Sequence, residues 1–273
     1  MKRRRTPIGS YLLTVVVWIG ALLMFAPIAW MVLTSFKSEQ DAVSYPPKLL
    51  FEPTLDHYRR IFESDLIAFA TISVLVTVIS TVIVIVLAVP AAYALTVRPV
   101  PKWRDVLFFF ISTKMMPAAA GIVPIYLVGR TLNLLNTPTI LIIVYTSMNL
   151  PLAIWMIRSF MAEIPQDVFD AVRVDGAGRI RELVQIIVPL IAPGLASTGL
   201  LCGIFAWNEF FFAVNLTTTV STLPVFLQKF LSFGELYTAQ VAAVATLINI
   251  PVILAGWLTQ KSLTRGLTFG AVR

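Results

Sequence analysis

The sequence predicts an all-α integral membrane protein with six transmembrane helices, and three observations lead to that prediction. First, 58% of the 273 residues are hydrophobic, only 13% are charged, and the mean hydropathy is +0.86. Soluble domains are about 25% charged, so a globular protein of this composition could not cover its surface with polar groups. Second, the apolar residues form long runs. Third, the basic residues lie mainly in the short gaps between those runs.

A helix needs about 20 apolar residues to cross about 30 Å of hydrocarbon. Six runs reach that length: 11–35, 66–97, 106–129, 139–160, 183–215 and 239–260. The fifth run is too long for one span, so we expect its cytoplasmic end to belong to a loop structure. Basic residues precede the first run, as in a secretory signal. That run is about twice as long as a signal core and ends in no small-x-small cleavage site, so we interpret it as a retained span.

The lysines and arginines predict the orientation. With the N-terminus inside, the cytoplasmic segments hold 14 of the 21 basic residues, the outside segments hold six, and Lys114 lies inside a run. This bias predicts that both termini are cytoplasmic. The expected organisation is a cytoplasmic N-terminus (1–10), a transmembrane domain (11–260) and a cytoplasmic tail (261–273). Segments 36–65 and 217–238 face outside, and segment 161–182 faces the cytoplasm. The apolar stretch 223–227 either docks a partner or folds back onto the membrane surface.

Charge and rare residues exclude several classes of function. The net charge is +7, and the basic residues responsible for it lie mainly between apolar runs. This placement predicts contact with anionic lipid and not with nucleic acid. Cys202 and His57 are the only cysteine and histidine, so no disulfide, metal cluster or convincing nucleophile–base pair is expected. The chain lacks a Gly-x-x-x-x-Gly-Lys-Ser/Thr phosphate loop. We therefore predict no catalytic residue, metal or cofactor in this chain, and any ATP and Mg²⁺ would be bound by a partner.

The cytoplasmic stretch before the fifth run predicts a short amphipathic helix. Pro165 suits a first helical turn, and Asp167 and Asp170 lie near the positive end of the helix dipole. The apolar positions with helical spacing are Val168, Phe169 and Val172. Gly176 follows where a left-handed stop is expected, and the chain re-enters the membrane at Pro189. A helix of this kind either rests on lipid or docks against a protein, and its acidic polar side suits anionic lipid poorly.

This stretch resembles the cytoplasmic signature of binding-protein-dependent ABC permeases. The signature is Glu-Ala-Ala, three residues, Gly, nine residues, and Ile-x-Leu-Pro. The residues at those positions here are Asp170, Ala171, Val172, Gly176, Ile186, Val188 and Pro189. Both gaps are kept, and the three substitutions are conservative. The resemblance implies the type I ABC importer permease fold and a coupling helix seated in a cleft of the ATPase subunit. The implied ATPase-coupling residues are Asp170, Ala171, Val172, Gly176, Ile186 and Pro189.

Nearly the whole chain resembles the second permease of carbohydrate importers, the maltose-G type. The supporting stretches are 34–37, 163–165, 205–209 and 266–272, and the stretches 112–117 and 266–272 are most similar to the sorbitol/mannitol branch. The resemblance implies an inner-membrane subunit of an ATP-driven importer for a sugar or sugar alcohol, such as sorbitol or mannitol, or for a related modified sugar. The implied partners are a second permease, an ATPase dimer and a periplasmic or lipid-anchored solute-binding protein.

Polar residues inside the apolar runs are candidates for the substrate path. Lys114 and Glu209 are charged groups within the third and fifth runs, and such groups are costly in lipid. Asn149 and Asn208 either bond substrate hydroxyls or join helices. Trp155 either stacks on a sugar ring or lies at the membrane interface. In maltose-type relatives the other permease can hold most of the sugar.

Two other functions compete with the importer subunit. A stand-alone secondary carrier for a small solute would need more spans or an ion-coupling acid at mid-membrane, and Glu209 is the one candidate, nearer the outside. An intramembrane enzyme would need a nucleophile–base pair or a metal site within a span, and the sequence shows neither.

Overall fold

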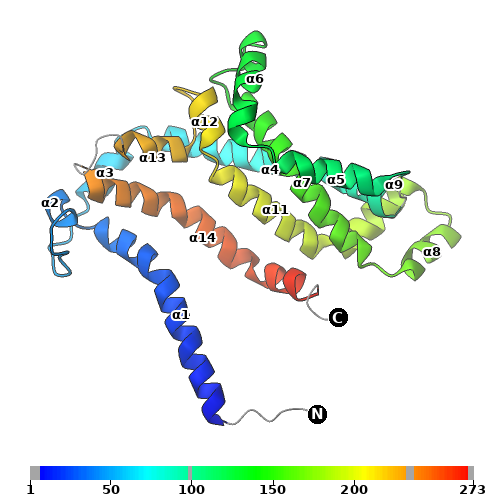
Figure 1. The fold of residues 1–273 in the computed structure, drawn as a ribbon, viewed down its shortest axis with the longest axis horizontal. Coiled ribbons are helices and arrows are strands. Elements are labelled where there is room, and N and C mark those ends of the chain that lie inside the picture. The colour runs from blue at the N-terminus through cyan, green and yellow to red at the C-terminus, as the bar shows by residue number, and fades with distance from the viewer. Residues whose placement is uncertain (1–6, 98–99, 232–236, 270–273) are drawn as a thin grey trace. The chain divides into compact units, whose positions relative to one another are not determined.

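The computed structural model describes residues 7–97, 100–231 and 237–269, and every element in these ranges is a helix (Figure 1). The chain divides into two compact units. Unit 1 consists of Met1–Asp65 and Leu227–Ile250, and unit 2 consists of Leu66–Phe226 and Pro251–Arg273. The helices α13 (Leu223–Leu231) and α14 (Thr238–Phe269) pass from one unit to the other.

Four helices in the described ranges are long and apolar enough to cross a membrane as single rods. These stretches are Tyr11–Thr34, Leu66–Thr96, Pro138–Ala162 and Thr238–Trp257. They belong to α1 (Pro7–Thr34), α4 (Leu66–Thr96), α7 (Pro138–Ala162) and α14. Two bent helix pairs pass the same test and raise the number to six if each pair is one span. The six predicted apolar runs therefore match four straight helices and two bent pairs.

The first bent pair occupies the predicted run 106–129. It consists of α5 (Trp103–Lys114) and α6 (Ala118–Thr131), which meet at 90°. Pro117 explains the position of the bend, because the ring of a proline disfavours helical backbone at the residue before it. Pro117 itself has an extended conformation (φ −58°, ψ 131°) and starts α6. The predicted straight span is thus a helix, a corner and a second helix.

The second bent pair occupies most of the predicted run 183–215. The stretch Arg179–Leu190 consists of α9 (Arg179–Arg181), the π-helix η1 (Glu182–Ile187) and α10 (Val188–Leu190). It meets α11 (Ala192–Trp207) at 79°. After α11 the chain breaks again before the short helix α12 (Phe211–Leu216). This run therefore does not form one straight helix, because the chain changes direction near Ile191.

Unit 2 is built around α4, which packs against α7 and α11. One apolar cluster joins these three helices to η1 and to the short helix α8 (Gln166–Val174), and it includes Ala92, Ile157, Phe169, Ile187 and Cys202. A second cluster joins α4 and α7 to α12. The start of α13 also packs within this unit, where the ring centroids of Phe69 and Phe226 lie 5.2 Å apart. The apolar stretch 223–227 therefore begins against α4, and Leu223 and Phe226 are buried.

Unit 1 contains α1, the short helices α2 (Glu39–Ala42) and α3 (Asp56–Phe62), and the start of α14. Along α1, every side chain from 11 to 30 is exposed, although most are apolar, as expected for a helix whose solvent is lipid. The segment 36–65 is held by polar contacts. The Glu39 carboxylate accepts hydrogen bonds from the backbone N–H groups of Ala239 (2.8 Å) and Gln240 (3.0 Å). These bonds cap the N-terminus of α14, where the helix dipole favours an acid.

Candidate coupling segment and transmembrane path

The helix α8 has a buried apolar face and an exposed acidic face. Phe169 and Val172 are buried, and Phe169 belongs to the cluster that joins α4, α7 and α11. Asp167 and Asp170 are exposed on the other side, and the Asp170 carboxylate accepts a hydrogen bond from the Gln166 side chain at 3.4 Å. The helix is therefore anchored through its apolar side, and its acidic side is exposed.

Gly176 ends this segment in a left-handed turn, as the sequence predicts. Its φ is +69°, a conformation that residues with a side chain adopt at a cost. The N–H of Ala177 donates to the carbonyl of Val172 at 3.2 Å, which is the 6→1 bond of a Schellman motif. A Cβ added at Gly176 would meet nothing within 4 Å. The backbone conformation, and not crowding within the chain, is thus what requires glycine here.

The other residues predicted to couple to an ATPase lie around this turn and on the stretch that follows it. Ala171 is exposed beside Asp170, Ile186 is half-buried in η1, and Pro189 is exposed in α10. The neighbouring Ile187 and Ile191 are buried in the same cluster as Phe169. The segment from α8 to α10 is therefore continuous with the core at the point where the chain bends into α11.

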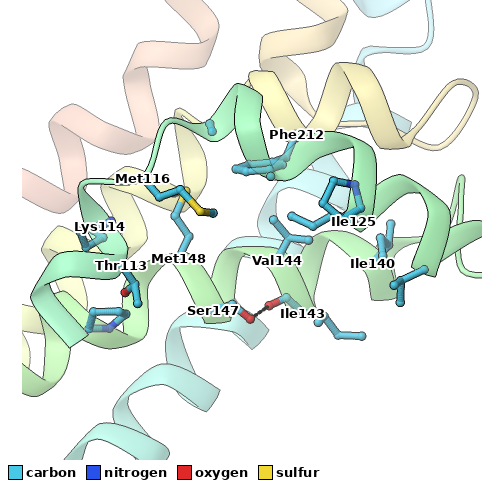
Figure 2. A pocket seen from close by; sticks show the side chains of 15 residues that line it. Thr113, Lys114, Met116, Ile125, Ile140, Ile143, Val144, Ser147, Met148 and Phe212 are labelled. Carbon is cyan, nitrogen blue, oxygen red and sulfur yellow. Dashed lines mark hydrogen bonds between the residues drawn. The ribbon is translucent and has the colours of Figure 1, made fainter. Parts of the chain in front are cut away.

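An open cavity of about 630 Å³ lies in the angle between α5 and α6, and α7 and α12 also line it (Figure 2). Its wall is mostly apolar, with residues such as Ile125, Val144 and Met148. Three residues bring polar groups to it: Thr113, Lys114 and Ser147. The Thr113 and Ser147 hydroxyls donate to backbone carbonyls of their own helices, at 2.6 and 2.8 Å. The Lys114 ammonium is thus the charged group of the cavity wall.

Lys114 owes its position to the bend after α5. It is the last residue of α5, and its ammonium lies 5.7 Å from the ring centroid of Phe205 on α11. This distance is within the range of a cation–π contact. Its side chain is exposed in the described chain. Figure 2 shows Lys114 and Thr113 close together in the view, with Ile140 well away from them.

Asn149 and Trp155 both lie on α7, but they face different directions. Six residues along an α-helix correspond to a rotation that differs by about 120° from whole turns. Asn149 is buried, and its Nδ2 donates to the Cys202 carbonyl at 3.5 Å, which joins α7 to α11. Its Oδ1 has no hydrogen-bond partner within the described residues. Trp155 is 46% exposed. Neither residue is among those that line the cavity.

Glu209 caps α12. Its Oε1 accepts from the N–H of Phe212 at 2.9 Å, and its Oε2 accepts from the N–H of Ala213 at 3.2 Å. The side chain is buried, so these bonds offset the cost of placing a carboxylate there. Asn208 is exposed, and its Nδ2 donates to the Ile204 carbonyl at 2.9 Å. Glu209 is thereby linked to the cavity only indirectly, because it orders the helix that supplies Phe212 to the wall.

Sequence reasoning missed Asn136, which organises the loop after α12. Its Oδ1 accepts from the N–H groups of Thr218, Thr219 and Val220 at 2.9, 3.0 and 3.1 Å. Its φ is +58°, which asparagine tolerates better than most residues. A turn-forming Asn between two apolar runs was the available signal. Its partners are more than 80 residues away in the chain, so no local pattern could identify them.

Comparison with known proteins places this architecture in context. Residues 84–265 match the family model described as the binding-protein-dependent transport system inner membrane component. The trehalose transport system permease SugB of Mycobacterium tuberculosis is 34% identical over the full length of both chains. The diacetylchitobiose uptake permease DasC of Streptomyces coelicolor is 33% identical, with 95% of this chain and 94% of DasC covered.

A solved structure agrees with the fold. A chain from the crystal structure of a bacterial ABC transporter involved in the import of the acidic polysaccharide alginate superimposes with a TM-score of 0.74 and 25% identity. The match covers 96% of the present chain and 98% of that chain. The relatives are named as permeases, which agrees with the prediction of a transporter subunit and not an enzyme. The chain belongs to the inner-membrane permease components of binding-protein-dependent ABC transport systems.

Proposed function

We propose that the chain is one of two membrane-spanning subunits of an ATP-driven importer for a sugar or sugar alcohol, with a polyol such as sorbitol or mannitol as the substrate. The family membership supports the permease role. Relatives named for trehalose, diacetylchitobiose and sulfoquinovosyl glycerol support a carbohydrate. The polyol proposal rests on the resemblance of stretches 112–117 and 266–272 to that branch.

The observation that carries the coupling role is the anchored helix α8 with its glycine-dependent turn. Its buried apolar face ties it to the core through Phe169, while Asp170 remains exposed. In this proposal the outer face of α8 seats in a cleft of a separate ATPase subunit, which binds ATP and Mg²⁺. The rigid turn at Gly176 then carries movement of the ATPase into the stretch that ends at Pro189.

The remaining partners follow from the same proposal. A second permease completes the translocation path, and a periplasmic or lipid-anchored binding protein delivers substrate to the outer segments 36–65 and 217–238. Both termini lie on the cytoplasmic side of a bacterial inner membrane. On this chain the substrate path passes the cavity between α5, α6 and α7, where the Lys114 ammonium can donate to sugar hydroxyls. The candidates Asn149, Trp155, Asn208 and Glu209 stay predictions for this path, and none of them lines the cavity.

Transport by the reconstituted complex tests this function. Liposomes would contain this chain with its second permease and ATPase, and uptake of labelled sorbitol, mannitol, trehalose and diacetylchitobiose would be measured with and without binding protein and ATP. We expect accumulation of a polyol that requires both ATP and binding protein. The control is the purified single chain in the same liposomes. If the single chain accumulated substrate against a gradient, the chain would be a secondary carrier.

A further inference from the structure

Glu182 is a buried carboxylate at the junction between the coupling segment and α11. Only 1% of its surface is exposed, and it is the first residue of the π-helix η1. Its Oε2 accepts a hydrogen bond of 2.8 Å from the hydroxyl of Tyr93, a residue on α4 that is 8% exposed. The two residues are 89 positions apart in the chain. This bond therefore links the stretch after Gly176 directly to the central helix of unit 2.

The π-helical geometry is what turns Glu182 inward. In an α-helix, a step of five residues ends about 140° away from the starting face, so Glu182 and Ile187 would face different sides. The wider turn of a π-helix brings residues five apart close to one face. Both side chains are buried here, and the next buried residue, Ile191, follows at the ordinary spacing of four. Single π-helical turns are frequent at functional sites, because they re-aim a side chain at the cost of regular helical bonding.

An apolar cluster lies beside this bond, and it joins the parts that move in the proposed mechanism. Tyr93 and Ile187 belong to the cluster that also contains Phe169 of α8 and Ile157 of α7. A hydrocarbon side chain at position 182 would fill such a site without the cost of desolvating a carboxylate. A directional hydrogen bond fixes the register between two helices, whereas apolar packing allows them to slide.

We propose that the Tyr93–Glu182 hydrogen bond is a coupling joint, which makes α4 move with the segment α8–α10 when the ATPase displaces it. This inference rests on the proposed coupling role of α8. Without the joint, displacement of α8 is absorbed by sliding of η1 along α4, and the path responds less to ATP hydrolysis. Tyr93 and Glu182 are then positioning residues, since neither touches substrate or ATP.

The test uses Tyr93→Phe, which removes only the hydroxyl, and Glu182→Gln, which keeps the shape and one carbonyl acceptor. The matched control is Tyr58→Phe, which removes a tyrosine hydroxyl that lies 2.7 Å from Ser35 Oγ in unit 1. The complete complex would be assayed for ATP hydrolysis and for uptake of the labelled sugar that wild type imports from the panel above. The measured quantity is sugar transported per ATP hydrolysed, together with the melting temperature of the complex.

We expect Tyr93→Phe to lower this ratio about tenfold, as the loss of a hydrogen bond to a charged group allows. Glu182→Gln should lower it less, and the double variant should be no worse than Tyr93→Phe, because both changes act on the same hydrogen bond. Tyr58→Phe should keep the wild-type ratio. An unchanged ratio in Tyr93→Phe, or uptake that falls only in proportion to the amount or stability of the complex, would overturn the proposal. If Gly176→Leu also kept the wild-type ratio, the proposed coupling role of α8 itself would be wrong. If Gly176→Leu lowered the ratio and Tyr93→Phe did not, only the proposal about the Tyr93–Glu182 bond would be wrong.

Discussion

Replacing Gly176 with leucine tests the role of the turn after α8 without disturbing the packing of the rest of the fold. The glycine has a φ of +69°, and a side chain in that conformation costs about 1–2 kcal/mol. A Cβ there would meet nothing within 4 Å, so no steric term within the chain adds to this cost. A change of this size shifts the population of the native turn by a factor of roughly 5–30. The membrane helices do not include this position, so insertion is expected to be normal.

The assay for Gly176→Leu measures four quantities: membrane level, ATPase association, hydrolysis stimulated by binding protein, and uptake. We expect normal levels, weakened association or lost stimulation, and lost uptake. Gly178→Leu is the matched control, because Gly178 also has open space around it but an ordinary extended conformation (φ −69°, ψ 159°). Gly176→Asn should retain more activity than Gly176→Leu, since asparagine tolerates left-handed backbone. Wild-type uptake and stimulated hydrolysis in Gly176→Leu would refute the coupling role of this segment.

Four further outcomes are expected. Lys114→Ala should lower uptake while the amount of assembled complex stays constant, and normal uptake would reduce Lys114 to a packing role. Glu209→Gln should weaken the cap of α12 by about 1 kcal/mol and impair uptake more than assembly, as measured by transport and by quantifying the purified complex. Gly194→Ala should reduce the melting temperature of the complex, because the added Cβ would overlap the ring of Phe160 and overpacking costs about 1–3 kcal/mol. The cysteine of Asp170→Cys should react with an impermeant reagent only from the cytoplasmic side. Labelling from outside would contradict the predicted orientation.

Hydropathy predicted where the membrane helices begin and end better than it predicted their direction. The runs at 66–97 and 139–160 became the single helices α4 and α7. The run at 106–129 contains the same kind of residues, yet it bends by 90°. Hydropathy reports how each residue partitions into lipid, and the backbone direction depends on Pro117 and on packing against α7 and α12.

The coupling segment was predictable because its signals are local. The helix start, the spacing of its apolar face and the glycine stop all lie within about a dozen residues, and Gly176 has the expected left-handed conformation. The role of Glu209 was not predictable from the sequence. A carboxylate in an apolar run suggests a residue of the substrate path, and only the structure shows its hydrogen bonds to the start of α12. Glu182 lies just before the fifth apolar run, and its contact with Tyr93 depends on how distant helices pack.

The bonds from Glu39 to the start of α14 affect the order in which the chain can be completed. The carboxylate and its two N–H donors are separated by about 200 residues of sequence. At synthesis rates of about 5–20 residues per second, the carboxylate waits roughly 10–40 s for the helix it caps. During that interval the loop after the first span exists without its final partner. Closure of unit 1 is therefore a late event, and a chain cut short before residue 239 would leave that loop open to proteases and quality control.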